Sequence, residues 1–101
     1  MYIVHSIFDV PAEKAEEVIA IYKNRSKLVD QAPGFRKFQL LHNQKKPGEL
    51  TVEITWEDKQ SYLTWVSGED FKRIHDLEKK YPDQELAAIR PTVKMFEVVA
   101  Q

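Results

Sequence analysis

The side chains of this sequence that could perform chemistry lie around Trp65 and His75, which are ten positions apart. Phe71, Ile74 and His75 fall at i, i+3 and i+4, so a helix through them places the imidazole on its apolar side. A neutral imidazole can bind a metal or act as a general base. Turned toward an apolar space, it is either a packed core residue or a ligand for something that binds there.

A hydroxyl on the first expected strand adds a third group. Ser6 shares a strand face with Tyr2, Val4 and Phe8, so a polar side chain interrupts an apolar row. Each of the three groups alone is more often structural than functional, because helix tryptophans usually pack in cores and strand serines usually bond to their own backbone. The indole, the imidazole and the hydroxyl together form one candidate catalytic site.

Composition excludes several other kinds of site. The chain has no cysteine, which rules out disulfides, thiolate metal sites and cysteine nucleophiles. Its three glycines are too far apart for a phosphate-binding loop, and no serine sits in a Gly-x-Ser-x-Gly elbow. The three histidines lack the i, i+4 pairing of zinc proteases. A formal net charge of -1 provides no basic surface, so we expect no nucleic-acid partner.

Length and hydropathy predict one globular domain over residues 1–101. The chain is 43% hydrophobic and 31% charged, as globular domains of this size usually are. His5, Ser6 and Asp9 interrupt the N-terminal apolar stretch, which argues against a secretory signal. No apolar run reaches the roughly 18 residues of a membrane span, so we expect no membrane partner and a cytoplasmic location.

The hydropathy pattern predicts four strands and two helical regions. Alternating or β-branched runs indicate the strands, and apolar residues at helical spacing indicate the helices. Pro11 suits a first helical turn, Asp58 suits an N-cap, and Ser67-Gly68 divides the second helical region. The expected strands are 2–8, 35–42, 49–56 and 92–99. The expected helices are one from 11 to about 30, one that follows the Asp58 N-cap and ends at the Ser67-Gly68 break, and a short one from about 69 that carries His75; 81–91 is expected to be a loop.

This order predicts a ferredoxin-like βαββαβ fold, an α+β domain with a four-stranded, mostly antiparallel sheet and helices on one face. The last strand carries Val93 and Met95 on one side and Phe96 and Val98 on the other, so both sheet faces are partly apolar. Helices cover only one of them. We therefore predict a homodimer whose two sheets pack face to face.

Several motifs also carry a family resemblance. They are the Pro33-Gly34-Phe35 turn, Trp56-Glu57, the stretch from Trp65 to His75 and the closing Phe96-Glu97-Val98-Val99. With them the chain resembles, nearly end to end, the antibiotic biosynthesis monooxygenase (ABM) superfamily of dimeric α/β barrels. The spacing of ten is similar to that of its IsdG-type heme-degrading monooxygenases. Members that bind no heme share Trp56-Glu57, Trp65 and Phe71, so these residues indicate the fold more than the substrate.

The resemblance implies roles for the candidate residues. His75 would be the proximal ligand of the heme iron, with Phe71 beside it, and Trp65 would press on one edge of the porphyrin and distort it. Heme would be both substrate and cofactor, alongside molecular oxygen and an external electron donor such as a reductase. The family asparagine on the first strand corresponds to Ser6, whose hydroxyl is shorter and has one donor hydrogen instead of two.

Two other functions remain open on the sequence. One is a cofactor-independent ABM-type monooxygenase acting on a small aromatic or quinol, with His75 as general base and Trp65 and Phe71 as pocket walls. The other is a non-catalytic dimeric domain in which His75 and Trp65 only pack.

Overall fold

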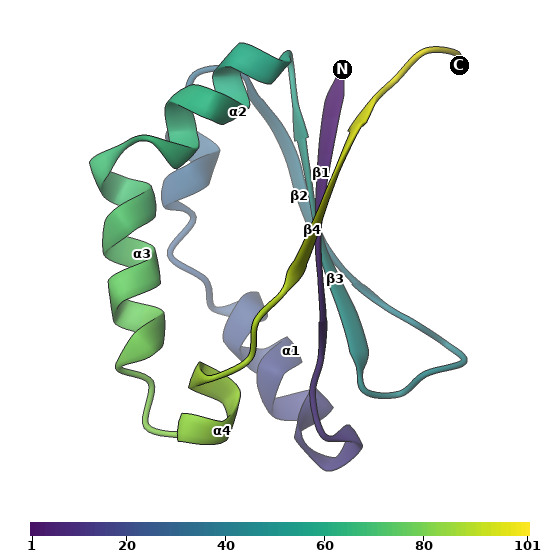
Figure 1. Ribbon diagram of the computed structural model, residues 1–101, viewed down its shortest axis with the longest axis vertical. Coiled ribbons are helices and arrows are strands. Elements are labelled where there is room, and N and C mark those ends of the chain that lie inside the picture. Colours follow the sequence, from purple (N-terminus) through teal and green to yellow (C-terminus); the bar gives the residue numbers. More distant parts are fainter.

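A four-stranded antiparallel sheet with helices on one face organises the computed structural model, which describes residues 1–101 (Figure 1). This confirms the predicted ferredoxin-like α+β fold. The elements in chain order are β1 (Tyr2–Asp9), η1 (Ala12–Lys14), α1 (Ala15–Lys23), η2 (Leu28–Gln31), β2 (Phe35–His42), β3 (Glu49–Trp56), α2 (Lys59–Val66), α3 (Glu69–Lys79), α4 (Gln84–Ala87) and β4 (Thr92–Glu97).

The strand order β2-β3-β1-β4 places β1 in the middle of the sheet, between β3 and β4. In this register Ser6 lies opposite Val52 of β3 and Val93 of β4. Because laterally paired residues point to the same side of a sheet, Ser6, Val52 and Val93 share one face. That face also carries buried Val4, so it is the one that the helices cover.

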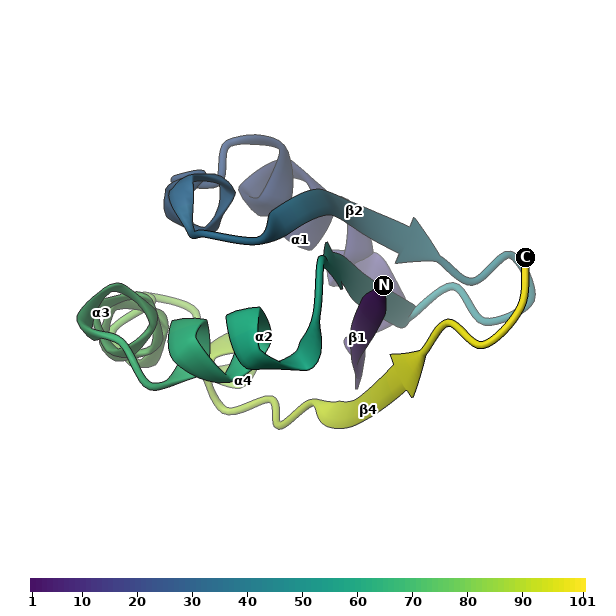
Figure 2. The same cartoon turned by 90° about the horizontal axis from the view of Figure 1, so that it is seen from above.

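Two hydrophobic clusters join the helices to the sheet. One contains Val10, Ala15, Val18 and Leu50 and fastens α1 to the sheet. The other contains Val4, Val29 and Trp56 and lies beneath α2. Neither cluster includes a residue of α3, and both views show α3 as the helix farthest from the strands (Figures 1 and 2).

The first helix is shorter than the sequence predicts. It ends at Lys23 instead of continuing to about residue 30. The Asn24 side chain donates a hydrogen bond to the Ala20 carbonyl at 2.9 Å, and Lys27 adopts a left-handed conformation with φ of 62°. Short polar side chains compete in this way for the last carbonyls of a helix. The chain then resumes as the 3₁₀ turn η2, which buries Val29.

The segment predicted as a loop, 81–91, contains one turn of helix, α4. Asp83 caps this turn by accepting hydrogen bonds from the backbone N–H groups of Glu85 and Leu86. The Lys14 ammonium contacts the Asp83 carboxylate at 2.8 Å and the Glu85 carboxylate at 3.1 Å, which ties the turn to η1. The last strand ends at Glu97, two positions before the predicted end.

The remaining element predictions are confirmed. β2 and β3 have the predicted bounds, and Asp58 caps α2 by accepting a hydrogen bond from the Ser61 N–H at 2.8 Å. Helical structure is interrupted at Ser67 and Gly68 as expected. The structure contains no helix of the length and hydrophobicity that crossing a membrane requires.

Candidate functional site

Three of the predicted site residues form a row of ring contacts across the junction of α2 and α3. The Trp65 and Phe71 ring centroids are 6.2 Å apart in an edge-to-face arrangement, and those of Phe71 and His75 are 4.3 Å apart. The break at Gly68 lets the chain turn between the helices, so that the end of α2 meets the first turns of α3. The structure therefore brings Trp65, Phe71 and His75 together, and we call these three residues the Trp65 row.

His75 keeps its contact with Phe71 but is exposed to solvent, and no residue of α3 is buried. It is also the one histidine without a hydrogen bond. His5 Nε2 contacts Glu53 at 2.8 Å, and His42 Nε2 contacts the Pro47 carbonyl at 2.7 Å. Both nitrogens of the His75 ring are thus free of protein partners. The ring is neither sealed in a core nor held by a neighbour.

The side of α3 that carries His75 is the side from which Phe71 packs against Trp65. Phe71, His75 and Glu78 follow one another at i, i+4 and i+7 and so share one helix side. Burial raises the pKa of Tyr22 on α1 to about 12, and the negative charge of nearby Glu78 adds to this rise. The packing contact that the structure gives this side of α3 is that of Phe71 with Trp65, while His75 and Glu78 are exposed.

Ser6 shares a strand face with Val4, as predicted, and this is the covered face of the sheet, but no hydrogen bond or ring contact joins Ser6 to the Trp65 row. Its side chain is half-buried and its hydroxyl makes no hydrogen bond. On the same face, Val93 and Met95 of β4 are 46% and 52% exposed. The helices therefore leave a strip of this face uncovered along β4, beside half-buried Ser6 of β1. We define the candidate site as Ser6, Val93 and Met95 on the strip, together with the Trp65 row.

Sequence reasoning missed this strip. The alternation of β4 placed Val93 and Met95 on one face, but the uncovered surface was expected only on the other. The cause is the position of α3, which contributes nothing to either core cluster and so leaves the sheet beneath it bare. Its exposed Leu77 and its lack of buried residues are consistent with a helix that stands away from the core.

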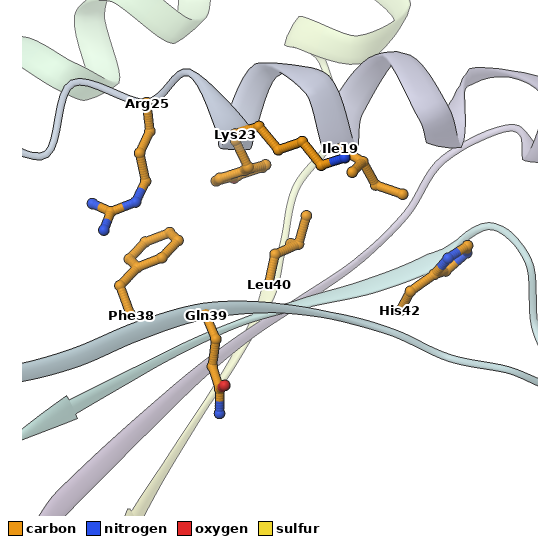
Figure 3. A pocket seen from close by; sticks show the side chains of 8 residues that line it. Ile19, Lys23, Arg25, Phe38, Gln39, Leu40 and His42 are labelled. Atoms are coloured by element: carbon orange, nitrogen blue, oxygen red, sulfur yellow. The ribbon is translucent and has the colours of Figure 1, made fainter.

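Two hollows of the chain lie elsewhere. One, of about 360 Å³, is a groove between α1 and β2 (Figure 3), where Phe38 and Leu40 point toward the helix and Gln39 points away. The Arg25 guanidinium lies 3.8 Å from the Phe38 ring centroid and pairs with the Asp30 carboxylate at 2.7 Å. Its positive charge is therefore already balanced by a partner within the chain. A second hollow lies between η2 and the α2–α3 junction; of the predicted site residues, it includes only Trp65.

Trp65 also has an inward neighbour that sequence reasoning treated only as a feature of the fold. The ring centroid of fully buried Trp56 lies 6.5 Å from that of Trp65 and 6.4 Å from that of Tyr62. The Trp56 Nε1–H has no hydrogen-bond acceptor. The signal for this cluster was present, because Tyr62 precedes Trp65 by three residues on one helix and Tyr2 pairs with Trp56 across the sheet.

No three His, Asp or Glu side chains gather into a group that could hold a metal ion.

Comparison with known proteins agrees with this architecture. The family model for the antibiotic biosynthesis monooxygenases matches residues 1–77. A heme oxygenase (mycobilin-producing) of Mycobacterium tuberculosis is 32% identical over 60 residues, which are 59% of this chain and 57% of that protein. The aligned stretch thus spans little more than half of the relative.

Solved structures resemble the whole chain. The heme degrader MhuD of Mycobacterium tuberculosis, with two hemes bound in its active site, superposes with a TM-score of 0.79 at 24% identity, covering 100% of this chain and 98% of that one. An antibiotic biosynthesis monooxygenase candidate of Deinococcus radiodurans gives 0.74 at 15% identity, with 100% and 95% covered. From the fold and the matched family model together, the chain belongs to the antibiotic biosynthesis monooxygenase family.

Proposed function

We propose that this protein is a heme-degrading monooxygenase. The observation that supports this most is His75, an exposed imidazole without a hydrogen bond that projects beside Phe71 from α3. A free neutral imidazole next to aromatic rings is the donor that a heme protein uses. The sequence similarity to a mycobacterial heme oxygenase points to the same substrate.

The aromatic neighbours of His75 would suit a flat apolar macrocycle. Phe71 and Trp65 supply ring faces and edges on the helix side, and exposed Val93 and Met95 add apolar surface on the helix-bearing face of the sheet. Sites for such ligands are mostly apolar and carry few oriented polar groups. Ser6 is the polar group of the strip, and its hydroxyl is free to donate.

Each residue then has a distinct role. Bound heme would supply the iron that activates oxygen and also the ring that is opened. His75 would hold the iron, Phe71 would fix the imidazole plane, and Trp65 would press on one ring edge. Ser6 would donate a hydrogen bond from the sheet side, directly or through a water. Electrons would come from an external reductant.

Turnover can be tested directly. Purified protein loaded with hemin should, with ascorbate in air, lose the heme absorption, release iron to a colorimetric chelator and yield an opened tetrapyrrole by mass spectrometry. His75→Ala should abolish iron release, while His42→Ala, which alters a histidine bonded to a backbone carbonyl, should retain it. Equal release from native protein and His75→Ala would refute the proposal.

We also propose that the protein acts as a homodimer through the sheet face that no helix covers. That face carries Ile3, Ile7 and Phe96 beside a hydrogen-bonded group in which Glu53 binds both His5 and Gln39. Phe96 is 44% exposed and its ring contacts His5 edge-on at 5.1 Å. An apolar patch with a satisfied polar group at its centre suits association with a second copy.

One observation favours the second candidate, a cofactor-independent monooxygenase of a small quinol. Metal-binding histidines usually donate their other N–H to an acceptor, and His75 has no such partner. An unpartnered imidazole is equally suited to removing a phenolic proton. Oxygen consumption with hydroquinones in heme-free protein, lost in His75→Ala, would support this candidate over heme degradation.

A further inference from the structure

Oxidisable aromatic side chains form a second continuous row, distinct from the Trp65 row, that leads away from the candidate site. The ring centroids of Trp65 and Trp56 are 6.5 Å apart, those of Trp56 and Tyr62 are 6.4 Å apart, and those of Tyr62 and Tyr2 are 5.8 Å apart. The row includes both tryptophans of the chain and two of its four tyrosines. It starts beside the predicted heme edge and ends on the first residue of β1.

Tryptophan and tyrosine are the aromatic residues that give up one electron most readily, and neighbouring rings at these separations exchange electrons in short steps. Phe35 and Phe71 border the row, but phenylalanine is too hard to oxidise to take part. The other two tyrosines lie outside it, because Tyr22 packs between Phe8 and Phe38 and Tyr81 contacts Glu17. The path for an electron vacancy therefore runs only from Trp65 toward Tyr2.

The unpartnered N–H of Trp56 gives this path its direction. A buried polar group without a partner is unusual and calls for an explanation, of which a redox role is one. An oxidised indole becomes a stable neutral radical only after its Nε1 proton leaves. Since Trp56 is fully buried and no acceptor is near, the proton stays and the oxidised ring remains a strong oxidant. Trp56 would pass the vacancy on and not retain it.

The tyrosine end can do what Trp56 cannot. Tyr62 and Tyr2 are both partly exposed, so a phenol that loses an electron can release its proton to water. The neutral tyrosyl radical that results is a weaker oxidant than the tryptophan radical cation. Transfer of the electron vacancy from the buried Trp56 indole to a partly exposed tyrosine phenol therefore lowers the free energy at neutral pH.

We propose that Trp65, Trp56, Tyr62 and Tyr2 form a relay that carries oxidising equivalents from the site to the surface. The proposal rests on the proposed oxygenase function, in which an oxygen-derived one-electron oxidant can form without substrate being attacked. That oxidant takes one electron from Trp65, Trp56 refills Trp65, and a tyrosine refills Trp56 while its phenolic proton passes to water. A thiol or ascorbate in solution then returns one electron to Tyr2, and water returns the proton.

Because the chain has no cysteine, a single introduced thiol can be labelled selectively with a photo-oxidant. The relay can then be tested without heme. A single Glu69→Cys change places a unique thiol on the exposed first residue of α3, which lines the same hollow as Trp65. A ruthenium polypyridyl complex attached there and oxidised by flash and quench injects the vacancy at Trp65. Transient absorption should show a tryptophan radical that decays as a tyrosyl radical grows.

Three variants of the labelled protein decide the outcome. Trp56→Phe should remove the tyrosyl signal and prolong the Trp65 radical several-fold, and Tyr62→Phe should reduce the tyrosyl yield without altering the buried core. Tyr81→Phe, outside the row, should change nothing. A tyrosyl yield that is unaffected by Trp56→Phe, or by Tyr62→Phe if the former does not fold, would overturn the relay. Because heme is absent, the result is independent of whether the protein degrades heme.

Discussion

At the scale of single residues, the unpaired ring nitrogens of His75 and of Trp56 differ in their exposure. Those of His75 are exposed beside Phe71, so they are available to a ligand. That of Trp56 is fully buried, so no ligand can reach it. The sequence identified His75 as a candidate site residue from its spacing to Trp65, but it could not predict that the Trp56 N–H would lack an acceptor. Whether a buried N–H finds an acceptor depends on residues brought together only by folding.

Asp58 provides a test at this scale. Its carboxylate accepts hydrogen bonds from the Ser61 N–H and hydroxyl, both at 2.8 Å, and these bonds hold its pKa below the ordinary 3.8. A folded-state pKa below the unfolded one stabilises the fold above about pH 4, and this stabilisation is lost as the pH falls further. Asp58→Ala should lower the thermal midpoint by a few degrees at pH 7 and much less at pH 3.

Asp76→Ala is the matched control, because Asp76 is exposed on α3 and makes no hydrogen bond or ion pair. Thermal unfolding followed by circular dichroism at both pH values measures the difference. An equal loss for the two variants, or a loss for Asp58→Ala that does not shrink in acid, would contradict the capping role.

At the scale of elements, the sequence predicted strands better than helix ends. β2 and β3 alternate cleanly and are joined by a polar hairpin loop, so their bounds could be read directly. The end of α1 could not, because Val29 continues the helical spacing and is indeed buried. It reaches the core from the separate turn η2, and hydropathy spacing does not distinguish a continuous helix from one that breaks and resumes.

The turn before β2 is held by a glycine that the fold requires. Gly34 has φ of +84°, and a Cβ there would collide with the Ser61 hydroxyl oxygen at the start of α2. A left-handed conformation alone costs a non-glycine residue about 1–2 kcal/mol. Gly34→Ala should therefore lower the free energy of unfolding, measured in urea, by about 2 kcal/mol or more.

Gly68→Ala supplies the comparison, since Gly68 has φ of -90° and its nearest neighbour to a new Cβ is 3.3 Å away. It should have a much smaller effect on the urea midpoint. If the two alanine variants unfolded at the same urea concentration, the contact between this turn and α2 would not matter as described.

At the scale of the whole molecule, the two sheet faces are uncovered for different reasons. The helix-bearing face has a bare strip because α3 stands away from the core, and we assign that strip to the substrate. The other face carries no helix, and we assign it to a second copy (Figure 2). The sequence indicated the second of these, because Val93, Met95 and Phe96 alternate across β4. It could not indicate the first, which depends on where α3 docks.

Phe96→Glu tests the dimer face. Phe96 is already 44% exposed in the single chain, so the change should leave the fold intact while placing a charge at the proposed interface. Light scattering after size exclusion should show dimer for the native chain and monomer for the variant. Ile21→Glu on α1, at 40% exposure, should remain dimeric. A monomeric native chain, or dissociation by both variants alike, would refute this interface.

The most direct test of the whole account is a hemin titration followed by absorption spectroscopy. Native protein should give a sharpened Soret band that saturates at equimolar hemin, because in this account the free imidazole of His75 would bind the iron. His42→Ala should titrate like the native chain, and His75→Ala should leave the spectrum of free hemin. A native spectrum identical to free hemin, or an unchanged Soret band in His75→Ala, would contradict the account.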